Sequence, residues 1–539
     1  MILITFTILC GYLLVKFAQN YINWLHTPLR KIPGPPNTNF WIGKFPIMFG
    51  KQSEPFMDPQ KRWWKKAGYD QPLLHYTLVF GRSNLIVLDK EIVQYILTSP
   101  YGKKDCRFAK AMDIAKTMVQ YGLVTLEGED WMRHRQIIQP AFNTSFIRES
   151  LSASAPRRVQ KLIAYWTQAA GREIDVSSHL SALTLDIIGD VGFGHEFEGL
   201  ESVKRWAENK DGMQEGLAEL KDPFIRALIE VFKFDPLSMF FFVIGKANWS
   251  RLLNPRNIEL RGHLDKATDQ VIANARRGGA SSDALSGGKQ KRLSLLHLLL
   301  QAQEKSNEEI NDDPILAKHK PLTDIELRDE VKTFILAGHE TTATWCYFAI
   351  YALCKFPDVQ EKVYQEIQQY LGGNRTMEDL ELDTIERMEY LDAFLSEVLR
   401  LYPPAGLFIR TNRYEEKIAG YTIPIGTRFV IPSHLLQRHP KYWKDPDTFQ
   451  PERWIHKDPA AKEEFHDKIR FAYFPFSAGG RNCIGQRFAT AEAKLIMAPL
   501  IYSFLFQLAP SQRYTEHTFS SFITMKLKPD LKIVATRRA

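Results

Sequence analysis

One long helical pattern in the second half of the chain sets the scale of the fold. The segment Thr323-Asp-Ile-Glu326 has the form of a helix capping box, and apolar residues at helical spacing follow it as far as Lys355, just before Pro357. A helix of about thirty-three residues is about 50 Å long, which is enough to cross a whole domain. We therefore expect a large domain through which this helix runs.

The rest of the chain is also mainly helical in pattern. Helical periodicity dominates the first two thirds, and no internal repeat or clear domain linker interrupts it. The best loop candidate, residues 276–292, is rich in Gly, Ser and charge and lies between two helical patterns. Because strands and helices do not alternate, the sequence predicts one large, mainly α domain with small β-sheets. The strand-like runs are few and short, and they lie at residues 85–88, 418–425, 429–431 and 527–534.

Composition and charge narrow the class of protein. Hydrophobic residues make up 45% of the 539 residues and charged residues 24%, which is typical of a folded globular protein and argues against disorder. The net charge of +8 is small for this length and gives no nucleic-acid signature. The five cysteines are scattered and odd in number, which argues against a disulfide framework or a zinc module and indicates reduced thiols facing the cytosol.

The N-terminal segment is apolar. Residues 2–15 carry no charge and would span about 21 Å as a helix, which is shorter than a bilayer core of about 30 Å. The helix reaches that thickness if it continues past Lys16 to Trp24. We expect a retained anchor rather than a cleaved signal peptide, because the segment has neither a basic start nor a small-residue cleavage site. Arg30 and Lys31 follow the apolar run, which favours a cytosolic location for the rest of the chain.

These features divide the chain into three parts. We expect a membrane anchor at residues 1–25, a basic and Pro-rich hinge at residues 26–45 and a catalytic body at residues 46–539. A second apolar run, at residues 237–244, has two interpretations: it belongs to the core, or it dips into lipid near an entrance to the site.

The clearest chemical signal lies at residues 476–485, Phe-Ser-Ala-Gly-Gly-Arg-Asn-Cys-Ile-Gly. Cys483 stands just before a helix-forming stretch at residues 486–496. At such a position the free N–H groups of the helix N-terminus favour a thiolate over a thiol. From the residues alone, Cys483 is a reactive thiol, a metal ligand or a small core residue.

The same run resembles the haem-binding loop of the cytochrome P450 family. It matches the pattern F-x-x-G-x-R-x-C-x-G at all five defined positions, which are Phe476, Gly479, Arg481, Cys483 and Gly485. The resemblance implies that Cys483 is the axial thiolate ligand of a haem b iron and that Arg481 pairs with a haem propionate. Thiolate ligation favours cleavage of the O–O bond, and an arginine fork suits a buried carboxylate.

Two further motifs resemble a Glu–Arg–Arg network of this family. Glu397 and Arg400 lie at positions i and i+3 of a helical pattern, so their charges can pair, although this spacing alone is common on surface helices. Residues 449–454, Phe-Gln-Pro-Glu-Arg-Trp, resemble the family segment whose arginine completes the network, which is Arg453 in this chain. The implied role of the three residues is structural support of the haem loop.

The middle of the long helix is a poor helix sequence. Residues 337–342, Ala-Gly-His-Glu-Thr-Thr, contain a glycine and two consecutive threonines, which favours a local distortion. The segment resembles the family pattern A/G-G-x-D/E-T-T, whose distortion forms an oxygen groove. The resemblance implies that Thr341 hydrogen-bonds the oxygen substrate, that Glu340 connects it to a proton-supplying water network, and that His339 is a spacer. Related fatty-acid ω-hydroxylases carry an esterified glutamate at the position of Ala337, so a noncovalent haem is expected.

Three other residues resemble positions that hold the haem propionates in the family. Trp131 and Arg135 match a W-x-x-x-R pattern and share one helix face, from which the indole N–H and the guanidinium can both donate. Arg410 follows the segment Leu401-Tyr-Pro-Pro404, where many members carry a basic propionate partner.

The resemblance implies a monooxygenase that inserts one atom of O₂ into a lipophilic substrate, by hydroxylation or epoxidation. The chain has no dinucleotide fingerprint, so its electrons are expected from an NADPH–cytochrome P450 reductase, with cytochrome b5 as a possible helper, at the endoplasmic reticulum membrane. Arg133 and Arg487 are either docking cations for this acidic partner or ordinary solvated charges.

Two other functions remain open at this stage. One is a P450-type isomerase or dehydratase, and the other is a haem-thiolate binding protein without catalysis. The substrate candidates are a fatty acid, a sterol, a terpenoid or a polyketide. The expected pocket walls are mostly apolar, and each is as readily explained as core; they are residues 111–126, Phe334, Ile335, residues 405–409 and residues 519–524.

Overall fold

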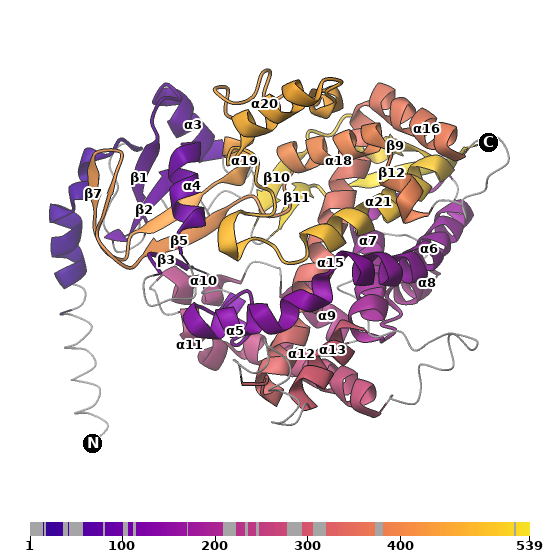
Figure 1. Ribbon diagram of the computed structural model, residues 1–539, viewed down its shortest axis with the longest axis horizontal. Helices are drawn as coiled ribbons and strands as arrows, with labels where there is room; N and C mark the ends of the chain where they lie inside the picture. Colours follow the sequence, from indigo (N-terminus) through magenta and orange to yellow (C-terminus); the bar gives the residue numbers. More distant parts are fainter. Residues whose placement is uncertain are drawn as a thin grey trace.

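A computed structural model gives the arrangement of the chain (Figure 1). It describes residues 15, 18–35, 41, 58–78, 81–100, 106–111, 115–169, 171–208, 223–231, 235–243, 247–277, 294–304, 320–371, 381–521 and 524–538. Helices form most of the body, and a smaller β-rich part lies on the left of the view. The mainly α fold with small sheets that the sequence predicts is therefore present.

The helices follow one another through most of the described chain. Their bounds are α3 Asp58–Lys66, α4 Lys90–Thr98, α5 Gly128–Ile138, α6 Thr144–Gln168, α7 Val176–Ile188, α8 Gly199–Glu208, α9 Pro223–Glu230, α10 Pro236–Val243, α11 Ala247–Leu253, α12 Pro255–Arg277, α13 Leu295–Glu304, α15 Asp324–Lys355, α16 Pro357–Leu371, α17 Leu382–Ile385, α18 Glu389–Leu401, α19 Ser433–Leu436, α20 Pro459–Ile469 and α21 Gln486–Ser503.

The strands form four small sheets. The largest has the order β1-β2-β8-β5-β3, and the others are β4-β12-β9, β10-β11 and β6-β7. The bounds are β1 Leu73–Thr77, β2 Ser83–Val87, β3 Phe108–Lys110, β4 Ile174–Asp175, β5 Phe408–Asn412, β6 Glu416–Ile418, β7 Tyr421–Ile423, β8 Arg428–Ile431, β9 Phe504–Leu508, β10 Thr518–Ser521, β11 Met525–Lys528 and β12 Lys532–Arg537.

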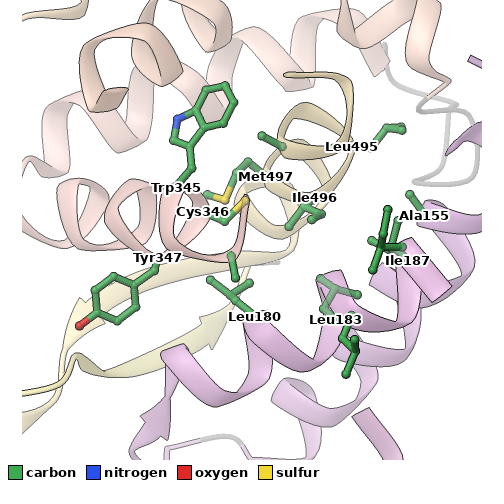
Figure 2. Packing of buried hydrophobic residues seen from close by; sticks show 14 of the residues in the cluster. Ala155, Leu180, Leu183, Ile187, Trp345, Cys346, Tyr347, Leu495, Ile496 and Met497 are labelled. Carbon is green, nitrogen blue, oxygen red and sulfur yellow. The ribbon is translucent and has the colours of Figure 1, made fainter. Parts of the chain in front are cut away.

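Helix α15 is the long helix that the sequence predicts. The capping box is formed: the Thr323 hydroxyl accepts from the Glu326 N–H, and the Glu326 carboxylate accepts from the Thr323 N–H at 2.8 Å. Most of the helix is buried. Figure 2 shows Cys346 beside Met497 and Ile496 of α21, with Leu180 and Leu183 of α7 nearby. Because α15 packs against helices from both halves of the chain, it organises the whole domain.

Two of the predicted strand runs are each divided in the structure. The run 418–425 is a β6–β7 hairpin, whose turn residues Ala419 and Gly420 both have positive φ. The run 527–534 supplies β11 and β12, which belong to different sheets, and Pro529 lies between them. The points of division coincide with turn residues in the sequence, Ala419-Gly420 in one run and Pro529-Asp530 in the other.

The basic and Pro-rich hinge contacts the body. The His75 N–H donates to the Pro33 carbonyl at 2.8 Å, and a Cβ added to Gly34 would lie 1.9 Å from the His75 carbonyl oxygen. Only glycine therefore permits this close approach to β1. Most of the predicted anchor, residues 1–25, lies outside the described residues. Among the described helices, none combines the length and the hydropathy that crossing a bilayer requires.

Candidate functional site

The loop 476–485 places Cys483 at the start of α21. The Cys483 N–H donates to the Phe476 carbonyl at 3.0 Å, which closes the loop. Gly479 has a φ of +71°, and a Cβ added to it would lie 1.9 Å from the Leu97 carbonyl oxygen at the end of α4. The loop can adopt this path only with glycine at position 479, which explains that part of the motif.

The thiol of Cys483 has an unusual environment. The residue is exposed, yet burial by surrounding protein raises the pKa of its thiol, against smaller opposing effects of the Gly485 N–H, Lys110 and Arg135. The helix N-terminus therefore does not by itself favour the thiolate as the sequence suggests, whereas a coordinating metal ion would deprotonate the thiol.

A cluster of cations lies beside Cys483. Lys110 of β3 and Arg410 of β5 are direct cross-strand partners, and Arg410 is almost fully buried. Arg481 is also buried, and its guanidinium donates to Glu127 at 3.1 Å. Like charges directly opposite each other in a sheet are destabilising, so Lys110 and Arg410 repel each other. Among the described contacts, Glu127 is the carboxylate that lies near these cations. The arrangement therefore fits a bound anion.

Lys110 was not found by sequence reasoning. Burial, together with Arg481 and Arg410, lowers the pKa of Lys110 to about 7, against smaller opposing effects of Glu127 and Cys483. Burial is the largest cause of this shift, and the two arginines add to it because they lie close to Lys110. No sequence pattern points to Lys110, because only the pairing of β3 with β5 brings it to the site.

Trp131 and Arg135 of α5 approach the loop in two different ways. The Arg481 guanidinium lies over the Trp131 ring, 4.3 Å from its centroid. Arg135 donates to the carbonyl and to the side-chain oxygen of Asn482, each at 3.2 Å. Arg135 thus holds the residue next to Cys483, and its expected contact with a propionate stays a prediction.

The structure brings Glu397, Arg400 and Arg453 together. Arg400 donates two bonds of 2.8 Å to the Glu397 carboxylate, and Arg453 donates a third at 3.0 Å. The Trp454 indole adds a fourth, also at 3.0 Å. Arg400 donates further to the carbonyls of Gln437, Pro446 and Thr448. Glu397 and Arg400 are completely buried, so the network is a fully bonded charged cluster of the kind that costs several kcal/mol (~3–5) to break.

The middle of α15 is open on one side. Ala337 is exposed and Thr341 is half-buried, although almost every neighbour on the helix is buried. The Thr341 hydroxyl donates to the Ala337 carbonyl at 2.7 Å, and Thr184 of α7 donates to the His339 carbonyl at 2.9 Å. The helix is nevertheless continuous through residues 337–342, so the expected distortion is not seen. The threonine hydroxyls satisfy carbonyls without opening the helix.

Glu340 and His339 are buried on the other side of α15. The His339 ring bonds the Ile335 carbonyl at 2.6 Å, which fits its interpretation as a spacer. Glu340 pairs with Lys526 of β11 at 2.8 Å. Burial alone would raise the pKa of Glu340, but Lys526 and His339 outweigh it and hold that pKa below its usual range.

The structure bears on two sequence-based interpretations that left alternatives open. Arg133 pairs with Glu326 and donates to the Lys320 and Pro321 carbonyls, so it is not a free docking cation. Ile335 and Phe334 are both buried, and the Phe334 ring makes a tilted contact with Phe142 at 5.7 Å between ring centroids. Of the expected pocket walls, residues 112–114 and 522–523 lie outside the described residues.

These residues fit a flat, dianionic group that carries a metal ion. Cys483 supplies an open sulfur ligand, and Lys110, Arg410 and Arg481 gather positive charge that suits two carboxylates. The exposed face at Ala337 and Thr341 leaves space against α15.

Comparison with known proteins agrees with this geometry. The cytochrome P450 family model matches residues 69–533. The chain belongs to the cytochrome P450 family. It is 31% identical to "Cytochrome P450 3A6" of Oryctolagus cuniculus over 394 residues, which cover 71% of this chain and 69% of that protein. It is 27% identical to "Cytochrome P450 3A16" of Mus musculus, covering 84% and 83% of the two chains.

A third relative is "Cytochrome P450 4d10" of Drosophila mettleri, at 29% identity and 88% and 86% coverage. As a cytochrome P450 the protein is a monooxygenase, and its cofactor is haem b ligated by a cysteine thiolate.

Proposed function

We propose that this P450 inserts one atom of O₂ into a lipophilic organic substrate, by hydroxylation or epoxidation, and that Cys483 is its haem ligand. One observation carries the proposal: the open Cys483 thiol lies near half-buried Lys110, around which the buried cations Arg410 and Arg481 gather. P450-type isomerases and dehydratases tend to lose the threonine and the acid of the long helix. This chain keeps both, as Thr341 and Glu340.

The proposed haem contacts divide by chemistry. Cys483 ligates the iron, while Phe476, Gly479 and Gly485 shape the loop around it. The propionates are held by cations and an indole, namely Arg481, Arg410, Lys110, Trp131 and Arg135. When bound, haem supplies the redox centre at which dioxygen is cleaved. The haem is noncovalent, because Ala337 has no carboxylate to form an ester.

Thr341 and Glu340 are the proposed proton pathway. Thr341 presents its hydroxyl on the open face of α15, where it now donates to Ala337 and can rotate to donate into the site. Glu340, the preceding residue, connects Thr341 to a polar cluster behind the helix, and protons would be relayed through its carboxylate from there.

Electrons are proposed to come from an NADPH–cytochrome P450 reductase, with cytochrome b5 as a helper. Arg487, at the start of α21, stays a candidate docking cation because its side chain is exposed; it also donates to Thr144 at 3.0 Å.

We propose that the protein is held at the endoplasmic reticulum membrane with its body on the cytosolic side. The anchor is residues 1–25. Trp249, Leu252 and Leu253 of α11 are exposed apolar residues, as is Leu237 of α10, and such a patch suits contact with lipid. A lipophilic substrate, whether fatty acid, sterol, terpenoid or polyketide, would reach the site from that phase.

The experiment is turnover with reductase, NADPH and a lipid and terpenoid panel. The panel is first screened for a spin-state shift of the haem, and product is then measured against NADPH consumed. Thr341→Ala is expected to consume NADPH with little product. If the ratio of product to NADPH is unchanged in Thr341→Ala, the proposed proton pathway is wrong. If no spin-shifting compound causes NADPH and O₂ consumption, the proposed oxygenation is wrong and the protein is a haem-thiolate binding protein.

A further inference from the structure

The Glu340 carboxylate points into a polar cluster formed by three elements. Lys526 and Thr524 both bond its Oε1, at 2.8 and 3.2 Å, and both belong to the segment around β11. Ser181 of α7 donates to its Oε2 at 3.4 Å. The acid is 5% exposed, so these contacts define its position.

Lys526 connects this buried acid with solvent. Its side chain is 34% exposed, whereas that of Glu340 is 6% exposed. The ammonium also donates to Ser177 at 3.3 Å. Beside it lies a small cavity lined by Ser177, Ser181 and Lys526 together with residues of α15. Its volume is about 10 Å³, which is about enough to hold one water molecule with polar partners.

The charges around the acid come from each of these elements. His339 lies on α15 itself, Lys526 on β11, Asp530 directly after β11, and Asp175 at the start of α7. Burial would lower the pKa of Lys526, but Glu340, Asp530 and Asp175 outweigh it and raise that pKa. The pair is therefore a true ion pair, with Glu340 anionic and Lys526 cationic.

We propose that Lys526 is a positioning residue for the oxygenation reaction. It holds the Glu340 carboxylate toward α7 and β11 and joins it, through the one-water cavity at Ser177 and Ser181, to the solvent that supplies protons. The inference rests on the proposed role of Glu340. It adds the residue that orients the Glu340 carboxylate and the route by which protons reach it from solvent.

The ion pair also ties the acid to the β10–β11 hairpin. Thr518–Ser521 pairs with Met525–Lys528, and the Met525 N–H bonds the Pro404 carbonyl at 3.0 Å. Thr524, within the segment expected to line the substrate pocket, shares the Glu340 oxygen with Lys526. A shift of this hairpin therefore moves both partners of the acid together.

The test compares Lys526→Met and Lys526→Arg in the full haem-loaded chain with reductase. Lys528→Met is the matched control, because Lys528 is an exposed lysine on the same strand. The measurement is product formed per NADPH consumed as a function of pH. In Lys526→Met the midpoint of this profile is expected to move to higher pH by about one unit, because a buried acid without its cation holds its proton longer. Lys526→Arg and Lys528→Met are expected to follow the wild type.

A second readout does not depend on activity. The melting temperature of Lys526→Met is expected to fall with rising pH relative to the wild type, since unfolding then releases the proton of the buried acid. In the double variant Glu340→Gln/Lys526→Met this extra pH dependence is expected to vanish. If Lys526→Met fails to fold, Lys526→Gln is measured in its place.

The outcomes separate the two claims. If Glu340→Gln leaves coupling unchanged, the proposed role of Glu340 is wrong. If Glu340→Gln uncouples the reaction but Lys526→Met keeps the wild-type profile, the role of Glu340 stands and the Lys526 inference is overturned.

Discussion

Glu492 provides a stability prediction that can be worked out in numbers. It lies on α21, six residues into the helix that follows Cys483, and it is completely buried. No described residue meets full hydrogen-bond geometry with either of its carboxyl oxygens, although the Thr342 side chain lies near enough to act on the acid. Burial raises its pKa from 4.5 to about 8, against a small opposing effect of Thr342.

The sign of the effect follows from where the proton goes. Between pH 4.5 and 8 the unfolded chain has lost the proton that the folded protein keeps, so stability falls as pH rises across this window. Each unit of pH corresponds to about 1.4 kcal/mol. From pH 5 to pH 7 the free energy of unfolding therefore falls by about 3 kcal/mol because of Glu492. This is an upper value, because rearrangement around the ionised carboxylate would reduce the loss.

Glu492→Gln removes this proton linkage and keeps nearly the same shape. The variant is expected to gain stability relative to the wild type as pH rises, by about 3 kcal/mol between pH 5 and pH 7. For a chain of 539 residues this corresponds to a relative increase of about 2–3 °C in melting temperature. Comparing the two pH values cancels the constant cost of burying an amide.

The assay is thermal melting of the haem-loaded protein in matched buffers, followed by circular dichroism. Glu415→Gln is the control, because Glu415 is an exposed carboxylate, and its curve is expected to run parallel to that of the wild type. Parallel curves for Glu492→Gln and the wild type would refute the reasoning that Glu492 is a buried neutral acid.

Three further predictions concern the haem site. Arg453→Ala removes one partner of buried Glu397, so the free energy of unfolding is expected to fall by about 3–5 kcal/mol, measured as a lower melting temperature. An unchanged melting temperature would contradict the structural role of the network. Binding of the dianionic haem favours the charged form of Lys110, so the haem affinity of the apoprotein is expected to weaken as pH rises above about 7. In a haem titration, Lys110→Met is expected to bind haem more weakly and with a smaller dependence on pH. Gly479→Ala would place a Cβ 1.9 Å from Leu97 and is expected to abolish haem incorporation, measured as the ratio of haem to protein absorbance; full incorporation would show that the loop can move.

The parts of the fold that the sequence predicts are those with a local cause. The capping box at Thr323 and the helix that follows it depend on neighbouring residues, and both are found as expected. The division of residues 527–534 into β11 and β12 depends on which distant strand each half meets, so periodicity could not show it.

The site shows the same limit. Glu397, Arg400 and Arg453 were named because two short motifs resemble those of the family, and the structure brings the three residues into contact. Lys110 was missed, since only the pairing of β3 with β5 carries it to Cys483. Lys526 was missed for a similar reason: its partner Glu340 lies on another element, 186 residues away in the sequence.

The proposal that Cys483 ligates the haem has one direct test, which is the absorption spectrum of the reduced protein with carbon monoxide. The wild type and Cys346→Ala, which alters a buried cysteine of α15, are expected to show the Soret band of a thiolate-ligated haem. Cys483→Ser is expected to lose that band. A thiolate band that persists in Cys483→Ser would contradict the account at its centre.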